Sequence, residues 1–130
     1  MNKKIGFRFV IMTVFAISLA YAQPATKVNY LSAKDFQKEA LISQNILIDI
    51  RTPEEYASGH IKDAKMIDFR QSNFAEQLKK LDHQKKTLIY CRSGRRTDAS
   101  LLEFEKQSFK QIVILKGGIQ SWSAAQLPFE

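Results

Sequence analysis

The 130-residue sequence has little cysteine: Cys91 is the only one. A single cysteine cannot form a disulfide within the chain, so a fold held together by internal disulfides is excluded. Cys91 must therefore be buried and inert, paired with another chain, or kept for its reactivity. The sequence also lacks internal repeats and low-complexity tracts, and its length suits one compact domain and not two.

Long apolar runs are scarce as well. The longest, residues 9–20, is shorter than the roughly 20 residues that a membrane-spanning helix needs. It follows three basic residues and precedes the small residues of Ala20-Tyr21-Ala22, an order typical of a secretory signal peptide. We therefore expect cleavage of residues 1–22 and export of the mature protein without a stable membrane anchor, to the periplasm in a Gram-negative bacterium.

The charge of the mature chain would be moderate. Cleavage leaves 17 basic residues against the 13 acidic ones, a net charge of +4. The basic residues form no run interleaved with aromatic residues, so nucleic-acid binding is not expected, whereas a small anionic substrate is compatible with them. Residues 23–29 carry little pattern and predict a flexible lead-in to a domain over residues 30–130.

Apolar runs alternate with amphipathic segments along this domain. Residues 46–50, 64–68, 87–90 and 112–115 predict short strands, and the continuous β-branched and apolar run at 46–50 is typical of a parallel sheet buried on both faces. Helical spacing or helix-start signals follow near residues 33–40, 53–56, 74–81, 97–104 and 119–125. The alternation predicts an α/β domain, with a parallel sheet and helices on both of its faces.

Cys91 directly follows the strand predicted at residues 87–90, the position where open parallel sheets bind ligands. Residues 91–96 read Cys-Arg-Ser-Gly-Arg-Arg and lead into a helix, whose N-terminal N–H groups and dipole can stabilise an anion. The three arginines add positive charge that favours the thiolate, the nucleophilic form of cysteine. An inert buried cysteine needs none of these features, so we predict that Cys91 is reactive.

Three segments together resemble the rhodanese family over roughly Leu31 to Trp122. The segments are residues 47–61, with Leu-Ile-Asp-Ile-Arg, Glu-Glu-Tyr and Gly-His-Ile; the loop that begins at Cys91; and residues 115–119, Leu-Lys-Gly-Gly-Ile, with Trp122. The resemblance implies a rhodanese-like fold with a small parallel β-sheet of about five strands, and a thiosulfate sulfurtransferase that needs no metal or organic cofactor.

The implied reaction has two steps and one catalytic residue, Cys91. Its sulfur takes the outer sulfur of thiosulfate, or of a similar small anionic donor, and passes it from a persulfide to cyanide or a thiol acceptor. Loop N–H groups would hold the persulfide and arginine side chains the donor, with Arg92 and Arg96 preferred and Arg95 either an anion contact or solvent-facing. The expected substrate-binding residues are Arg92, Ser93, Gly94, Arg95, Arg96 and Thr97.

Two other functions stay open. The chain could be a sulfur carrier or binding module that a partner protein loads, or a cysteine-loop phosphatase or arsenate reductase. The latter enzymes resemble a pattern with five residues between cysteine and arginine, whereas four separate Cys91 from Arg96, and the shorter loop favours sulfur.

Several residues of the resembling segments are expected to be structural. We predict that Asp49 and Arg51 pair with each other or with Glu55, and that His60 is a hydrogen-bonded structural residue. Trp122 is expected in the core. One departure from the family pattern is Ser108, which stands where a glycine often ends the helix after the active loop.

Overall fold

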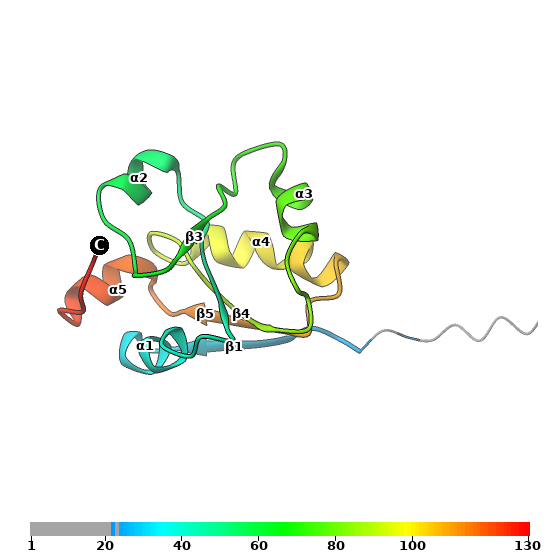
Figure 1. Ribbon diagram of the computed structural model, residues 1–130, viewed down its shortest axis with the longest axis horizontal. Helices are drawn as coiled ribbons and strands as arrows, with labels where there is room; N and C mark the ends of the chain where they lie inside the picture. Colours follow the sequence, from blue (N-terminus) through cyan, green and yellow to red (C-terminus); the bar gives the residue numbers. More distant parts are fainter. Residues whose placement is uncertain (1–21, 23) are drawn as a thin grey trace, which may run out of the picture.

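The computed structural model describes residue 22 and residues 24–130, so the signal peptide predicted at residues 1–22 lies almost wholly outside the described residues (Figure 1). A five-stranded, all-parallel sheet has the strand order β1-β5-β4-β2-β3. The strands are β1 (Lys27–Leu31), β2 (Ile46–Asp49), β3 (Lys65–Met66), β4 (Lys86–Tyr90) and β5 (Gln111–Leu115). The helices are α1 (Ala33–Ala40), α2 (Pro53–Ala57), α3 (Phe74–Lys79), α4 (Arg95–Lys106) and α5 (Gly118–Ala124).

The central strands bury both of their faces, as the sequence predicts. Leu88 and Tyr90 of β4 face the core shared with α1 and α5, while Ile89 and the following Cys91 face the core shared with α3 and α4. Figure 1 shows α1 and α4 on opposite sides of the sheet. The predicted parallel sheet with helices on both faces is confirmed.

The expected flexible lead-in at residues 23–29 is wrong in its second half. Residues 27–29 begin β1, which pairs along β5 from Lys27 opposite Gln111 to Leu31 opposite Leu115. An edge strand needs no continuous apolar run, because one side of it has no neighbouring strand and its side chains are only partly buried. The sequence therefore lacks the signal that marked the inner strands.

Local sequence signals place the helix starts correctly. Ser32 caps α1 by accepting a hydrogen bond from the Asp35 N–H at 3.3 Å, and Thr52 caps α2 in the same way from Glu55 at 3.3 Å. The helix α4 ends at Lys106, and Ser108 beyond it has a φ of +58°, the left-handed conformation that favours glycine. No helix within the described part of the chain is long and apolar enough to span a bilayer.

Candidate active site

The candidate site lies at the carboxyl end of β4, between the ends of β2 and β5. The chain leaves β4 at Cys91, turns through Gly94 with a φ of +108°, and enters α4 at Arg95. The loop is therefore shorter than the predicted span of residues 91–96, and Arg95, Arg96 and Thr97 belong to the first helical turn. This arrangement directs the N-terminus of a twelve-residue helix at the cysteine.

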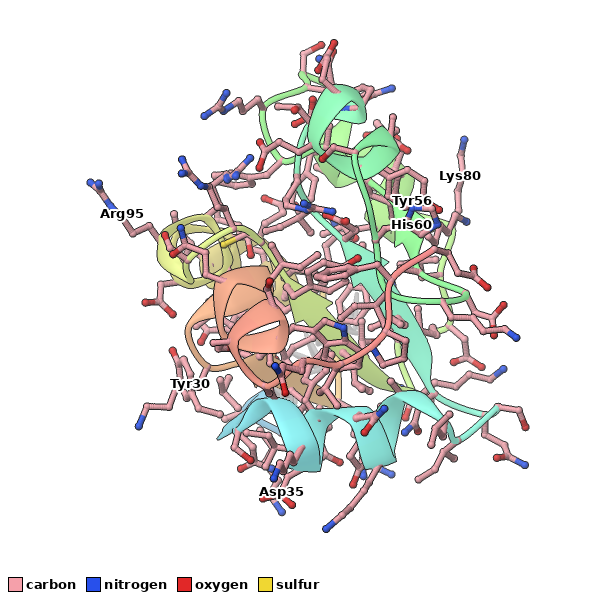
Figure 2. The ribbon with its side chains drawn as sticks, turned by 90° about the vertical axis from the view of Figure 1, so that its left-hand side faces the viewer. Tyr30, Asp35, Tyr56, His60, Lys80 and Arg95 are labelled. Atoms are coloured by element: carbon pink, nitrogen blue, oxygen red, sulfur yellow. The ribbon has the colours of Figure 1, made fainter. Side chains whose placement is uncertain are left out.

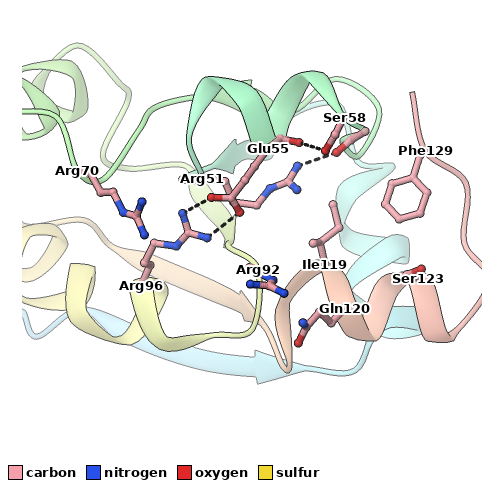
Figure 3. Close-up of a pocket in the computed structure, with 11 residues that line it drawn as sticks. Arg51, Glu55, Ser58, Arg70, Arg92, Arg96, Ile119, Gln120, Ser123 and Phe129 are labelled. Carbon is pink, nitrogen blue, oxygen red and sulfur yellow. Dashed lines mark hydrogen bonds and ion pairs between the residues drawn. The ribbon is translucent and has the colours of Figure 1, made fainter.

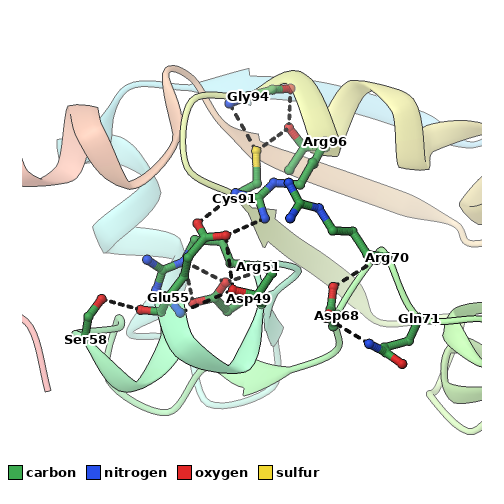
Figure 4. Close-up of polar contacts among 12 residues, drawn as sticks. Asp49, Arg51, Glu55, Ser58, Asp68, Arg70, Gln71, Cys91, Gly94 and Arg96 are labelled. Carbon is green, nitrogen blue, oxygen red and sulfur yellow. Dashed lines mark hydrogen bonds and ion pairs between the residues drawn. The ribbon is translucent and has the colours of Figure 1, made fainter.

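The Cys91 sulfur has polar partners although it is buried. Its side chain is 1% exposed, as an inert cysteine would be. The Gly94 N–H, however, donates to Sγ at 3.1 Å, and the thiol contacts Thr97 Oγ1 at 3.9 Å (Figure 4). The Thr97 hydroxyl in turn donates to the Gly94 carbonyl at 2.8 Å. A sulfur held at a helix N-terminus by a backbone N–H is placed where negative charge is stabilised.

Gly118, at the start of α5, supports the loop from behind. The N–H groups of Ile119 and Gln120 donate to the carbonyls of Cys91 and Arg92, at 2.8 and 3.2 Å. Gly118 has a φ of +62°, and a Cβ at this position would lie 2.6 Å from the Cys91 carbonyl oxygen and even closer to that of Arg92. Only glycine permits this approach, so the two loops fit together because residue 118 has no side chain.

Arg96 forms an ion pair with Glu55. Its Nη1 and Nη2 atoms donate to the two carboxylate oxygens of Glu55 in α2, at 2.7 and 2.8 Å (Figure 4). The hydrogen bonds from Arg96 lower the pKa of Glu55 to about 2, and the same contact raises the pKa of Arg96. The anion contact predicted for Arg96 is thus filled by a carboxylate of the chain itself, because α2 packs across the loop.

A pocket of about 510 Å³ opens between α2, the active loop and α5 (Figure 3). It is lined by four arginines, Arg51, Arg70, Arg92 and Arg96, and its other walls include Glu55, Ile119 and Phe129. Arg51 pairs with Asp49, and Arg96 pairs with Glu55. Among residues 24–130, neither Arg70 nor Arg92 forms an ion pair, so the pocket keeps two uncompensated positive charges.

The other predicted loop residues face away from this pocket. Arg95 projects outward from α4 (Figure 2). With Ser93 and Gly94 it lines a separate hollow, where the Tyr30 hydroxyl donates to Asp98 at 2.8 Å. Of the two alternatives for Arg95, the geometry favours the solvent-facing one.

The residues expected to be structural have structural contacts. The Arg51 guanidinium donates to both carboxylate oxygens of Asp49, from Nε to Oδ1 at 2.9 Å and from Nη2 to Oδ2 at 2.6 Å, and to the Gly59 carbonyl at 2.7 Å. His60 stacks on Tyr56 with ring centroids 3.7 Å apart (Figure 2), and Trp122 is 2% exposed. The predicted Asp49–Arg51 pairing is confirmed, whereas Glu55 pairs with Arg96 instead.

Three residues of the site were not predicted from the sequence. The pairing of Glu55 with Arg96 joins side chains that are 41 positions apart in the sequence. Arg70 lines the pocket but lies outside the three segments that resemble the family. Gly118 lies in the Leu-Lys-Gly-Gly-Ile segment and is the contact point with the active loop. A glycine pair just after a strand is a usable signal for such an approach, but no local pattern marks Arg70 or the pairing of Glu55 with Arg96.

The fold and site define a small parallel α/β domain with a buried cysteine, held at a helix N-terminus, below an arginine-lined pocket. Residues 32–125 match the Rhodanese-like domain family, and the chain belongs to it. Among solved structures, a rhodanese-related protein from Thermoplasma volcanium is similar, with a TM-score of 0.68 and 26% identity. The match covers 78% of this chain and 97% of that one.

Curated relatives carry more than one kind of name. An Allochromatium vinosum sulfurtransferase is 28% identical over 102 residues, which is 78% of this chain and 94% of that protein. A probable adenylyltransferase/sulfurtransferase of Mycobacterium tuberculosis is 35% identical over 82 residues, or 63% of this chain, but the match spans only 21% of that protein. The human M-phase inducer phosphatase 3 is 34% identical over 121 residues, covering 80% of this chain and 25% of the phosphatase.

Proposed function

We propose that the protein is a thiosulfate sulfurtransferase that carries sulfur as a persulfide on Cys91. The observation that carries the proposal is the placement of the sulfur, 3.1 Å from the Gly94 N–H at the start of α4 and next to a pocket with two unpaired arginines. Family membership and the sulfurtransferase relatives support it. No metal or organic cofactor enters the reaction.

The chemistry needs only the sulfur and the charges around it. The Cys91 thiolate attacks the outer sulfur of thiosulfate, a new S–S bond forms, and the bond to the sulfonate sulfur breaks so that sulfite leaves with the electron pair. The product is a cysteine persulfide anion, and each side of the equation carries three negative charges. Cyanide or a thiolate then takes the outer sulfur and restores the Cys91 thiolate.

The charges of the pocket suit this leaving group. Arg70 and Arg92 are free to contact the sulfonate oxygens, and charge-assisted hydrogen bonds from arginine to such oxyanions are strong. Glu55, with a pKa of about 2, is ionised at neutral pH and cannot donate a proton. A donor whose leaving group departs as an unprotonated anion, as sulfite does, fits these groups.

Two alternatives are separated from this proposal by the same experiment. A carrier role, in which a partner protein loads Cys91, would use the same persulfide. A phosphatase role is suggested by the similarity to the human M-phase inducer phosphatase, but four residues between Cys91 and Arg96 make a tighter loop than the five-residue pattern. A tighter loop leaves less room for a tetrahedral phosphate, so we favour sulfur.

We also propose that the protein is exported after cleavage of residues 1–22, to the periplasm in a Gram-negative bacterium. The basic start, the short apolar run and the small residues at positions 20–22 support this. The N-terminal sequence of the protein recovered from a periplasmic extract tests it. A chain that begins at residue 23 is expected, and an uncleaved chain in the cell interior would contradict the proposal.

The deciding experiment compares the wild type with Cys91→Ser. Each protein is incubated with thiosulfate, and its intact mass is measured by mass spectrometry. Cyanide is then added, and the thiocyanate that forms is assayed. We expect the wild type alone to gain one sulfur atom and to form thiocyanate. Loading without turnover favours the carrier role, and no loading, with hydrolysis of an aryl phosphate, would establish the phosphatase role.

A further inference from the structure

The ion pair between Glu55 and Arg96 forms part of the wall of the pocket, next to the active loop. Both side chains line the pocket, whereas Cys91 does not (Figures 3 and 4). Arg96 belongs to the first turn of α4, the helix whose N-terminus holds the sulfur (Figure 4). A donor that enters the pocket therefore meets the ion pair before it reaches Cys91.

The Glu55 carboxylate binds the Arg96 guanidinium in the same way as the oxyanion of an incoming donor would. Two parallel N–H···O bonds, at 2.7 and 2.8 Å, join the two groups. This bidentate arrangement is the one by which a guanidinium binds any planar or tetrahedral oxyanion. A sulfonate bound first by Arg70 and Arg92 can therefore exchange with the carboxylate at Arg96.

Helix α2, which carries Glu55, is suited to such an exchange. It contains five residues, and none of them is fully buried. The Glu55 side chain is 28% exposed, so it can rotate toward solvent without leaving a cavity in the core. Two bonds anchor the helix: the Glu55 N–H donates to the Thr52 hydroxyl at 3.3 Å, and the Tyr56 hydroxyl donates to the Ala64 carbonyl at 2.8 Å. The Thr52 hydroxyl also donates to Glu55 Oε1 at 3.3 Å, so rotation of the carboxylate breaks this bond together with the Arg96 contact and leaves the other two in place.

From this geometry we propose that Glu55 is a specificity-determining residue that holds Arg96 in the resting protein and closes the pocket floor over Cys91. An anionic donor displaces the carboxylate, binds Arg96 and gains access to the sulfur, whereas a neutral reagent cannot displace the carboxylate and reaches the sulfur more slowly. The inference rests on the proposed function and deepens it, because it names the requirement for an oxyanionic donor. It also explains how a reactive cysteine stays 1% exposed at rest.

The test uses Glu55→Gln, with Glu54→Gln as the matched control on the exposed side of the same helix. Cys91 is alkylated with iodoacetamide, a neutral reagent, and the rate is followed by intact mass. Steady-state kinetics with thiosulfate give KM. We expect Glu55→Gln to react about fivefold faster with iodoacetamide and to have a KM about fivefold lower than the control, the factor that corresponds to opening one partly buried ion pair.

A merely structural role predicts the opposite change in KM. If Glu55 only fixes Arg96 in a binding position, its loss leaves Arg96 mobile and KM rises. Unchanged alkylation, or a raised KM, in folded Glu55→Gln would overturn the proposal. Folding is checked by circular dichroism, and Glu55→Asp serves as a second variant whose shorter side chain keeps the charge but not the reach to Arg96. Faster alkylation of Glu55→Asp is expected, and a wild-type rate would also count against the proposal.

Failure of the proposed function is visible separately. The alkylation rates depend only on access to the sulfur and need no sulfur transfer. If thiosulfate fails to load the wild type but Glu55→Gln is alkylated faster, the pocket closure stands and the sulfurtransferase proposal fails. If loading succeeds and the alkylation rates do not differ, the reverse holds.

Discussion

Replacing Glu55 with glutamine tests how strongly the site is held together by charge. The pKa of Glu55 is lowered from 4.5 to about 2, with the Arg96 hydrogen bonds as the largest cause. At about 1.4 kcal/mol for each tenfold change in proton affinity, this difference sets an upper bound of roughly 3.5 kcal/mol on the stability that the ionised group contributes. The side chain is 28% exposed, and solvent screening reduces the contribution to about 1–2 kcal/mol.

The sign of the pH dependence follows from the direction of the pKa change. A carboxylate whose pKa is lowered by folding stabilises the native state above its unfolded pKa, here near 4.5, and the contribution is lost as the pH falls through about 2. We therefore expect Glu55→Gln to be less stable at pH 7, with a Tm lower by about 5–10 °C for a domain of this size. The difference should shrink steadily between pH 4.5 and pH 2.

Urea unfolding at pH 7 and thermal unfolding from pH 7 to pH 2 provide the measurement, with Glu54→Gln as the control. Both variants lose one carboxylate from the same helix, so the comparison isolates the contact of Glu55 with Arg96. A stability difference of the same size at pH 2 and pH 7 would refute the electrostatic reasoning, because it would show that the substitution acts through packing. No difference at pH 7 would show that water screens the pair completely.

Two further predictions concern the loop and the pocket. Gly118→Ala places a Cβ 2.6 Å from the Cys91 carbonyl oxygen at a φ of +62°. We therefore expect the free energy of unfolding in urea to fall by about 2–3 kcal/mol and sulfur loading to be slower. Wild-type values for both measurements would contradict the close approach. Arg70→Ala and Arg92→Ala each remove an unpaired charge from the pocket, so we expect either substitution to raise KM for thiosulfate about tenfold with little change in kcat. Arg95→Ala is the control, because Arg95 points outward from α4, and we expect it to behave as the wild type.

The closed pocket bears on the oxidation of Cys91. A reactive thiol in an oxidising compartment is open to sulfenic acid and mixed-disulfide formation, and the proposed export would place the protein there. A sulfur that is 1% exposed and lies behind the Glu55–Arg96 pair is shielded from neutral oxidants such as hydrogen peroxide. A resting persulfide on Cys91 would protect the sulfur in addition to this shielding.

Local patterns in the sequence were sufficient for much of the fold. The continuous apolar runs at β2, β4 and β5 predict inner parallel strands, since both of their faces must be buried. Ser32 and Thr52 mark helix starts because capping depends on residues only three positions apart. The loop after Cys91 is equally local, because a strand end, a glycine and a helix start lie within a few residues.

Only the tertiary structure decided which distant residues meet. The edge strand β1 depends on pairing with β5, more than 80 positions away, and its own side chains carry no apolar run. The strand order brings α2 across the active loop, so that Glu55 pairs with the arginine that the sequence assigns to the donor, and it places Arg70 and Arg92 in the same pocket. Periodicity and capping act over one or two helical turns, whereas these contacts arise from how the elements pack. The sequence by itself therefore determined the cysteine and its loop, and the packing of the elements determined how the cysteine is reached.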